Sequence, residues 1–208
     1  MVFNYTDNYQ FSTRLQLNNE NLEIVKYARL LGVIISDNLS WDNNTSDLVK
    51  RSNARMELLR KVAGFSTSIE EKKNIYILYI RSILEQSSVV WHSSLTREKA
   101  EDLERVKKNA VRIILGKPFN DYNEALEKIG LQTLNERRNK LSLKFAKKYL
   151  KNDKTKGMFP LRSKIHTMEN RNEEKYVVKY ANTDRLKNSA IPYMQRMLND
   201  DIRRNVIK

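Results

Sequence analysis

The sequence predicts an α+β fold that is predominantly α-helical, with a small antiparallel β segment near its N-terminal end. Three observations support this prediction. The first forty or so residues carry short strand-like patterns in which apolar and polar side chains alternate. Most of the remaining chain repeats its apolar residues every three or four positions, as amphipathic helices do. Only 5 Gly and 3 Pro occur in 208 residues, which favours long helices over tight turns.

The β prediction covers residues 1–41. A half-buried strand is expected over Phe11–Leu17, followed by a turn at Asn18–Asn21. A second strand is expected over Leu22–Tyr27 and a third over Ala28–Ile35. Three short strands seldom form a stable sheet alone, so this segment needs another element to pack against.

Two helices are predicted next. The first spans 44–63 and is followed by Gly64, which suits the position just after a helix end. The second spans about 69–90 and is opened by the capping box Ser68–Glu71. It is apolar nearly all round from Ile75 to Leu84, so we expect it to be the central buried helix.

Three further helices follow in the pattern. One spans about 97–115, with Leu103, Val106, Ala110, Ile113 and Ile114 facing inward. A short helix is capped near Asp121 and ends at Gly130. A second capping box, Thr133–Glu136, opens a helix that continues to about Leu150.

The C-terminal segment is less regular. Residues 152–174 have a weak pattern typical of a loop or linker, and 176–180 suit a strand or a buried extended segment. Pro192 is expected at the first position of a final helix that ends near Arg204.

The charge of the chain points to an anionic partner. There are 39 Lys and Arg against 25 Asp and Glu, a formal net charge of +14. Nucleic acid is the commonest partner of so basic a protein, although a merely basic soluble protein remains the plain alternative. The absence of Cys excludes disulfides, thiol catalysis and Cys-ligated zinc.

No apolar run approaches the roughly 20 residues of a membrane span, and the segment Met1–Asp7 does not resemble a signal peptide. The expected location is therefore intracellular, in the cytoplasm or nucleus, without a membrane partner.

Basic residues gather on two of the predicted helices. On the helix after Thr133, a spacing of three or four residues aligns a stripe in which few acids intervene: Arg137, Lys140, Lys144, Lys148 and Lys151. The first helix carries Lys50, Arg51, Arg55 and Arg60. Such residues suit phosphate contacts, although a charged stripe on an amphipathic helix is often only its solvated face.

Catalytic patterns are weak. His92 and His166 lack the companions of a zinc motif, and His92 follows Trp91 at the end of an apolar stretch, which favours packing or capping. Asp200–Asp201 resembles a metal-binding pair but suits solvated helix surface better. The sequence therefore predicts no catalytic residue, no metal ligand and no cofactor in this chain.

Several motifs, taken in order, resemble the C-terminal part of reverse transcriptases from jockey-like, LINE-type retrotransposons that lack long terminal repeats. The first pair is Leu30–Ile35 with Leu39–Trp41, and the further segments are Asn53–Arg60, Ile75–Ser82, Leu84–Ser87, Val90–Leu95, Leu103–Val106 and Ala181–Ala190. The resemblance covers essentially the whole chain.

The resemblance implies a division into three parts. Residues 1–41 would end the palm and include the primer grip, with Leu31, Gly32 and Val33 in its hairpin. Residues 42–151 would form a helical thumb that holds the template–primer duplex, and 152–208 would be a linker and C-terminal extension.

The resemblance also implies what the chain lacks. It contains no Tyr/Phe-x-Asp-Asp hairpin and no fingers, as if the frame began just past the catalytic strands. The Mg²⁺ of the parent polymerase would be held by that missing palm, so the chain is expected to bind an RNA or DNA duplex without being an enzyme on its own. The alternative is a non-catalytic helical module that binds an acidic protein.

Two tests follow from the sequence. Neutralising Arg51, Arg55 and Arg60 together should flatten the salt dependence of nucleic-acid binding. Gly32 either lets the backbone approach a primer or serves packing alone; in the second case Gly32→Val lowers stability instead of affecting primer position.

Overall fold

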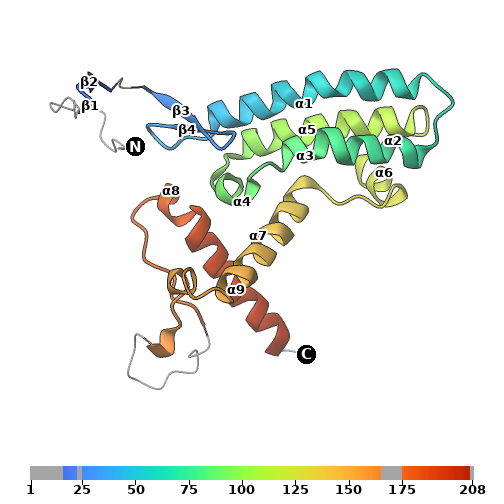
Figure 1. The fold of residues 1–208 in the computed structure, drawn as a ribbon. Coiled ribbons are helices and arrows are strands. Elements are labelled where there is room, and N and C mark those ends of the chain that lie inside the picture. The colour runs from blue at the N-terminus through green and yellow to red at the C-terminus, as the bar shows by residue number, and fades with distance from the viewer. Residues whose placement is uncertain (1–15, 23–24, 165–174, 207–208) are drawn as a thin grey trace.

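The computed structural model describes residues 16–22, 25–164 and 175–206. Figure 1 shows a helical bundle with a β hairpin at one end and a smaller helical part below it. The mainly helical α+β fold predicted from the sequence is confirmed. Residues 11–15 of the first predicted strand lie outside the described residues.

Two separate antiparallel hairpins make up the β segment. The first pairs β1 (Gln16–Leu17) with β2 (Glu20–Asn21) across a turn at Asn18–Asn19. The turn predicted over Asn18–Asn21 was therefore too long. The described residues of the strand predicted over Leu22–Tyr27 contain strand only at Tyr27. The second pairs β3 (Tyr27–Leu30) with β4 (Val33–Ser36). The prediction of one strand over Ala28–Ile35 was therefore wrong, because the chain reverses in the middle of that run.

The reversal uses a two-residue turn, Leu31–Gly32, in which both residues have positive φ, 49° and 82°. Two positive φ values are those of a type I′ turn, whose twist matches that of antiparallel strands. Leu rarely adopts this conformation, so only Gly32 hinted at the turn in the sequence. Leu31 is 91% exposed at the tip, whereas Val33 is buried in the bundle core.

The bundle is built from α1 (Asp42–Ala63), the segments between residues 69 and 94, α5 (Arg97–Leu115) and α6 (Tyr122–Lys128). Its core contains Leu48 and Leu59 of α1 and Leu103 of α5. Ile80 and Leu84, from the segments between residues 69 and 94, also belong to it. The expected inward face of α5 is confirmed. Gly64 directly follows α1, as expected. Its φ of −74° is right-handed, so α1 ends without a residue in the left-handed conformation at this position.

The helix predicted over 69–90 is interrupted. It consists of α2 (Ile69–Ile75), the π-helical η1 (Tyr76–Arg81), α3 (Ser82–Leu84) and α4 (Ser88–Trp91), and the short 3₁₀ turn η2 (His92–Ser94) follows. The break lies at residues 85–87, where Ser87 has a φ of 50°. Side chains stabilise it: Trp91 Nε1 donates to Gln86 O at 2.9 Å, and Arg138 Nη2 donates to Leu84 O at 2.8 Å.

The prediction that this segment is buried on every side was also wrong. Tyr76, Ile80 and Leu84 are fully buried, but Leu78 is 65% exposed and Tyr79 is 48% exposed. The apolar residues of the segment therefore exceed what the bundle can cover.

The helix α7 (Leu134–Leu150) connects the bundle to the C-terminal part, where α9 (Ala190–Val206) packs against it (Figure 1). A second, smaller core joins them through Ala146, Phe159, Met194 and Leu198. Between these two helices lie the 3₁₀ turns η3 (Lys156–Met158) and η4 (Arg162–Lys164) and the short helix α8 (Asp184–Lys187).

Of the two alternatives for 176–180, the strand does not form: the described residues there make one isolated bridge, between Leu161 and Tyr176, and the segment is half-buried at first and exposed at Lys179 and Tyr180. The predicted position of Pro192 was wrong. Pro192 is the third residue of α9, not the first. This position is still compatible with a helix, because the first four N–H groups of a helix have no partner within it.

Within the described part of the chain, no helix has the length and apolar character needed to cross a membrane.

Candidate nucleic-acid interface

The lysine stripe of α7, defined as Lys140, Lys144 and Lys148, is exposed to solvent. The opposite face of the helix is buried, with Leu134, Arg138, Ser142 and Ala146 also at four-residue spacing. Because residues four apart lie on one face, burial of the second set directs the first set outward. The capping box at Thr133 and Glu136 fixes where this helix begins, with Thr133 N 3.1 Å from Glu136 Oε2.

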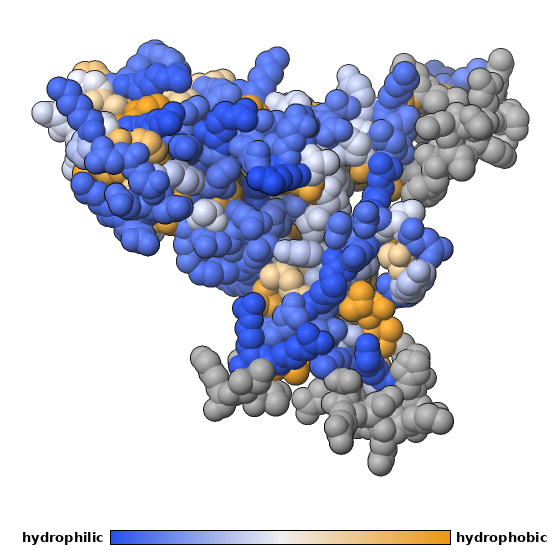
Figure 2. All heavy atoms as spheres, turned by 180° about the vertical axis from the view of Figure 1, so that it is seen from behind, coloured by the Kyte–Doolittle hydropathy of each residue, from blue (hydrophilic) through white to orange (hydrophobic). Residues whose placement is uncertain are grey.

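None of the three stripe lysines has an ion pair or side-chain hydrogen bond to any described residue, whereas Lys147 on the neighbouring face contacts Asp201 at 2.7 Å. Lys151, at the end of the helix, is also exposed. Figure 2, which views the molecule from behind, shows a surface dominated by hydrophilic side chains. An exposed row of unpaired ammonium groups is chemically suited to phosphate oxygens.

The basic residues of α1 do not form one comparable stripe. Lys50 and Arg55 are exposed and unpaired among the described residues, and they lie about 140° apart around the helix. Arg60 is exposed and contacts Glu57 at 2.9 Å, one turn earlier. Such an exposed pair contributes little to stability, so it does not prevent Arg60 from contacting another anion.

The side chain of Arg51 links α1 to the break between α3 and α4. Its Nε lies 2.8 Å from Asp47, and both Nη1 and Nη2 donate to Gln86 Oε1 at 3.1 Å. Asp47 in turn contacts Arg29 of β3 at 3.0 Å. Burial raises the pKa of the Asp47 carboxyl, but the hydrogen bond from Arg29 and the charges of both arginines outweigh burial and lower it overall.

Gly32 lies directly against this network. A Cβ atom at Gly32 would lie 2.3 Å from Gln86 Nε2, and the residue also has a positive φ. The network of Arg29, Asp47, Arg51 and Gln86 therefore holds the β3–β4 hairpin on the bundle, and Gly32 permits the close approach. Of the residues expected at a primer grip, Leu31 is at the exposed tip and Val33 is in the core.

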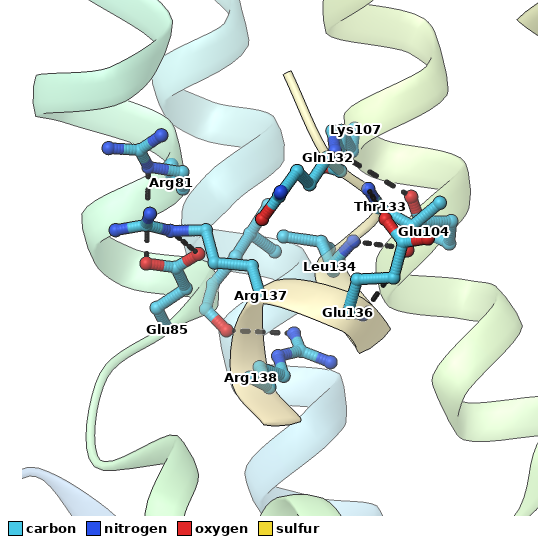
Figure 3. Close-up of polar contacts among 11 residues, drawn as sticks. Arg81, Glu85, Glu104, Lys107, Gln132, Thr133, Leu134, Glu136, Arg137 and Arg138 are labelled. Carbon is cyan, nitrogen blue, oxygen red and sulfur yellow. Dashed lines mark hydrogen bonds and ion pairs between the residues drawn. The ribbon is translucent and has the colours of Figure 1, made fainter. Parts of the chain in front are cut away.

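Arg137, expected in the basic stripe, belongs to a polar cluster at the start of α7 (Figure 3). Its Nε lies 2.6 Å from Glu85 Oε1, an ion pair without aligned hydrogen-bond geometry. Arg81 approaches the other oxygen of the same carboxylate at 3.9 Å. Arg137 is thus held by an acid from another segment, which distinguishes it from the three lysines that follow it.

Two more cationic residues of this cluster are buried. Arg138 is 1% exposed and lies 4.9 Å from the Trp91 ring, and burial lowers its pKa to about 10. Lys107 is 2% exposed, donates to the backbone oxygen of Gln132, and is 3.9 Å from Glu104. Burial lowers the pKa of Lys107 to about 8.

Sequence reasoning missed this cluster, although one signal was present. Lys107 occupies an inward position of α5, four residues after Leu103 and three before Ala110. Arg138 likewise follows Leu134 by four residues on the buried face of α7. A charged residue at such a position indicates a buried partner, because burial of an unpaired charge is costly.

His92, Asp200 and Asp201, the weak catalytic candidates of the sequence, make contacts that suit structural roles. His92 is buried, as expected for a packing residue, with Nε2 2.9 Å from Asn139 Oδ1. Asp200 is 3.7 Å from Arg203, while Asp201 pairs with Lys147. No group of three or more His, Asp or Glu suited to a metal ion occurs in the described ranges. His166 lies outside them.

Comparison of the chain with protein-family models, curated proteins and solved structures finds no match.

Proposed function

We propose that this chain binds the phosphate backbone of a nucleic-acid duplex, largely without regard to sequence. One observation carries the proposal: Lys140, Lys144 and Lys148 form an exposed row on α7 with no acid paired to them among the described residues. Lys50 and Arg55 of α1 would supply further contacts. Arg51, Arg60 and Arg137 would contribute less, since each already has an acidic partner.

We further propose that the duplex is a template–primer and that the chain is the thumb-like part of a retrotransposon-type reverse transcriptase. The motif order described above supports this proposal, as does a hairpin carrying Leu31, Gly32 and Val33 immediately before a basic helical bundle. The chain would hold the duplex and not copy it, because Mg²⁺-binding aspartates of a palm would have to come from elsewhere.

The test replaces all three stripe lysines with Gln and measures affinity for a labelled RNA–DNA duplex over a range of KCl concentrations. Each lost phosphate contact reduces the slope of log affinity against log salt by about 0.9, so the slope should decrease by about 2 to 3. Affinity at low salt should decrease as well.

The matched control removes the same charge at three exposed cations that already have acidic partners. Arg97 contacts Glu101 at 2.7 Å, Arg105 contacts Asp102 at 3.1 Å, and Lys156 contacts Asp153 at 2.5 Å. The triple Gln variant at 97, 105 and 156 should keep most of the original slope. Equal losses in both variants would show that overall charge, and not the stripe, governs binding.

The alternative partner is an acidic protein surface. It would be favoured if the chain bound polyglutamate but not duplex at the same ionic strength, and that result would reject nucleic-acid binding.

A further inference from the structure

A cavity of about 190 Å³ lies beside the start of α7, between η1 and α5. Its charged lining residues are cationic, and no acid of the described part of the chain lines it. The lining residues are Tyr76, Arg81, Lys107, Gly130, Leu131, Gln132, Leu134 and Arg137. The acids of the cluster, Glu85 and Glu104, contact these cations but are not among the lining residues.

The two arginines of the lining share one carboxylate. Arg137 and Arg81 both contact Glu85 through Nε, at 2.6 and 3.9 Å, and no other described acid pairs with either guanidinium. Figure 3 shows both side chains approaching Glu85 from separate helical segments. Burial lowers the pKa of Arg81, and the charge of Arg137 lowers it further. Positive charge here therefore exceeds what Glu85 neutralises.

Lys107 and Tyr76 complete the polar wall. The Lys107 ammonium donates to Gln132 O and has Glu104 only at 3.9 Å. The hydroxyl of Tyr76 is buried and has no hydrogen-bond partner among the described residues. Buried polar groups are normally paired, so an unpaired hydroxyl beside three cations indicates a site built for an acceptor.

We propose that this cavity binds one tetrahedral oxyanion of the phosphate class. A water molecule occupies roughly 30 Å³ in the liquid, so the cavity has room for about the five heavy atoms of a phosphate group. Guanidinium groups match phosphate geometry, and the Lys107 ammonium adds a point charge. A phosphate ester would place its phosphate group beside these cations.

The site is separate from the lysine stripe and does not depend on the proposed duplex binding. A bound anion would hold together the segments where α7 leaves the bundle, because the residues that contact it come from η1, α5 and α7.

Calorimetric titration of the full chain with inorganic phosphate, at constant ionic strength set by chloride, tests the proposal. We expect saturable binding of one phosphate per chain. Arg81→Gln should weaken it about tenfold or more, as expected for loss of a charge-assisted contact. The matched variant Arg97→Gln, which removes an exposed charge outside both proposed sites, should leave it unchanged. Non-saturable binding, or equal weakening in both variants, would overturn the proposal.

A second measurement needs no variant. In side-chain NMR of the unmodified chain, phosphate should raise the pKa of Lys107 above its value of about 8, because the anion stabilises the ammonium form. No change in this pKa at saturating phosphate would also overturn the proposal.

A further titration distinguishes a free ion from a phosphate ester. A nucleoside 5′-monophosphate that competes with inorganic phosphate would identify an ester as the ligand class, whereas phosphate binding without such competition would identify the free ion. The triple Gln variant at 140, 144 and 148 should bind phosphate normally even if it loses duplex binding, so failure of either proposal is recognised separately.

Discussion

His92 should make the stability of this protein decrease in mildly acidic solution. Its pKa is lowered from the usual 6.5 to about 4, mainly by burial; the contact with Asn139 opposes this effect and the charge of Arg138 adds to it. Nδ1 has no described partner, and Asn139 Oδ1 also accepts from Tyr193 at 2.5 Å. The site therefore accommodates a neutral imidazole and not a charged one.

The sign follows from the lowered pKa. Between pH 6.5 and about 4 the unfolded chain binds a proton at this residue and the folded chain does not, so stability present above pH 6.5 is lost as the pH falls. With these two pKa values, the loss at about pH 5 is about 2 kcal/mol relative to neutral solution. For a chain of this size, that corresponds to a melting temperature lower by roughly 4–8 °C.

Urea denaturation followed by tryptophan fluorescence at about pH 7 and about pH 5 measures this loss. Carboxyl groups with lowered pKa values act mainly below that range, which keeps the histidine effect distinct. The control is His92→Gln, whose side-chain amide can still donate to Asn139 but does not titrate, and which retains His166. An equal loss in this variant would refute the assignment to His92.

Three further predictions concern stability and are read by the same denaturation assay. Arg138→Ala should cost about 3–5 kcal/mol, because it opens a cavity beside Trp91 and leaves a backbone oxygen at the helix break unpaired; a cost below about 1 kcal/mol would contradict this. Gly32→Val should cost about 2 kcal/mol or more, since its Cβ would meet Gln86 at a positive φ, while duplex affinity per folded molecule should not change. Leu31→Asn should stabilise the exposed turn by up to about 1 kcal/mol, and any destabilisation would argue against the type I′ assignment.

Features encoded by neighbouring residues could be predicted from the sequence. The capping boxes Ser68–Glu71 and Thr133–Glu136 mark the starts of α2 and α7, and both form as expected. The inward face of α5 was also predicted, because a helical period of apolar residues depends only on spacing.

Features that depend on distant partners could not be predicted. The helix break at Ser87 contains neither Gly nor Pro and is stabilised by side chains of Trp91 and Arg138. Arg137 and Arg138 are adjacent in the sequence, yet one pairs with Glu85 at a half-buried site and the other is buried against an aromatic ring. Spacing alone cannot separate such residues from an exposed lysine.

In the candidate interface, too, local features could be predicted from the sequence and contacts with distant residues could not. The exposure of Lys140, Lys144 and Lys148 followed from helical periodicity. The engagement of Arg51 with Gln86, which is 35 residues away, did not, because its partner lies on another segment.

The most direct test of nucleic-acid binding is the anisotropy of a labelled RNA–DNA duplex titrated with the unmodified chain at several KCl concentrations between about 50 and 200 mM. We expect a straight line of log affinity against log salt with a slope of about −3 or steeper, as three lysine–phosphate contacts require. Absence of binding at the lowest salt, or an affinity that does not change with salt, would contradict it.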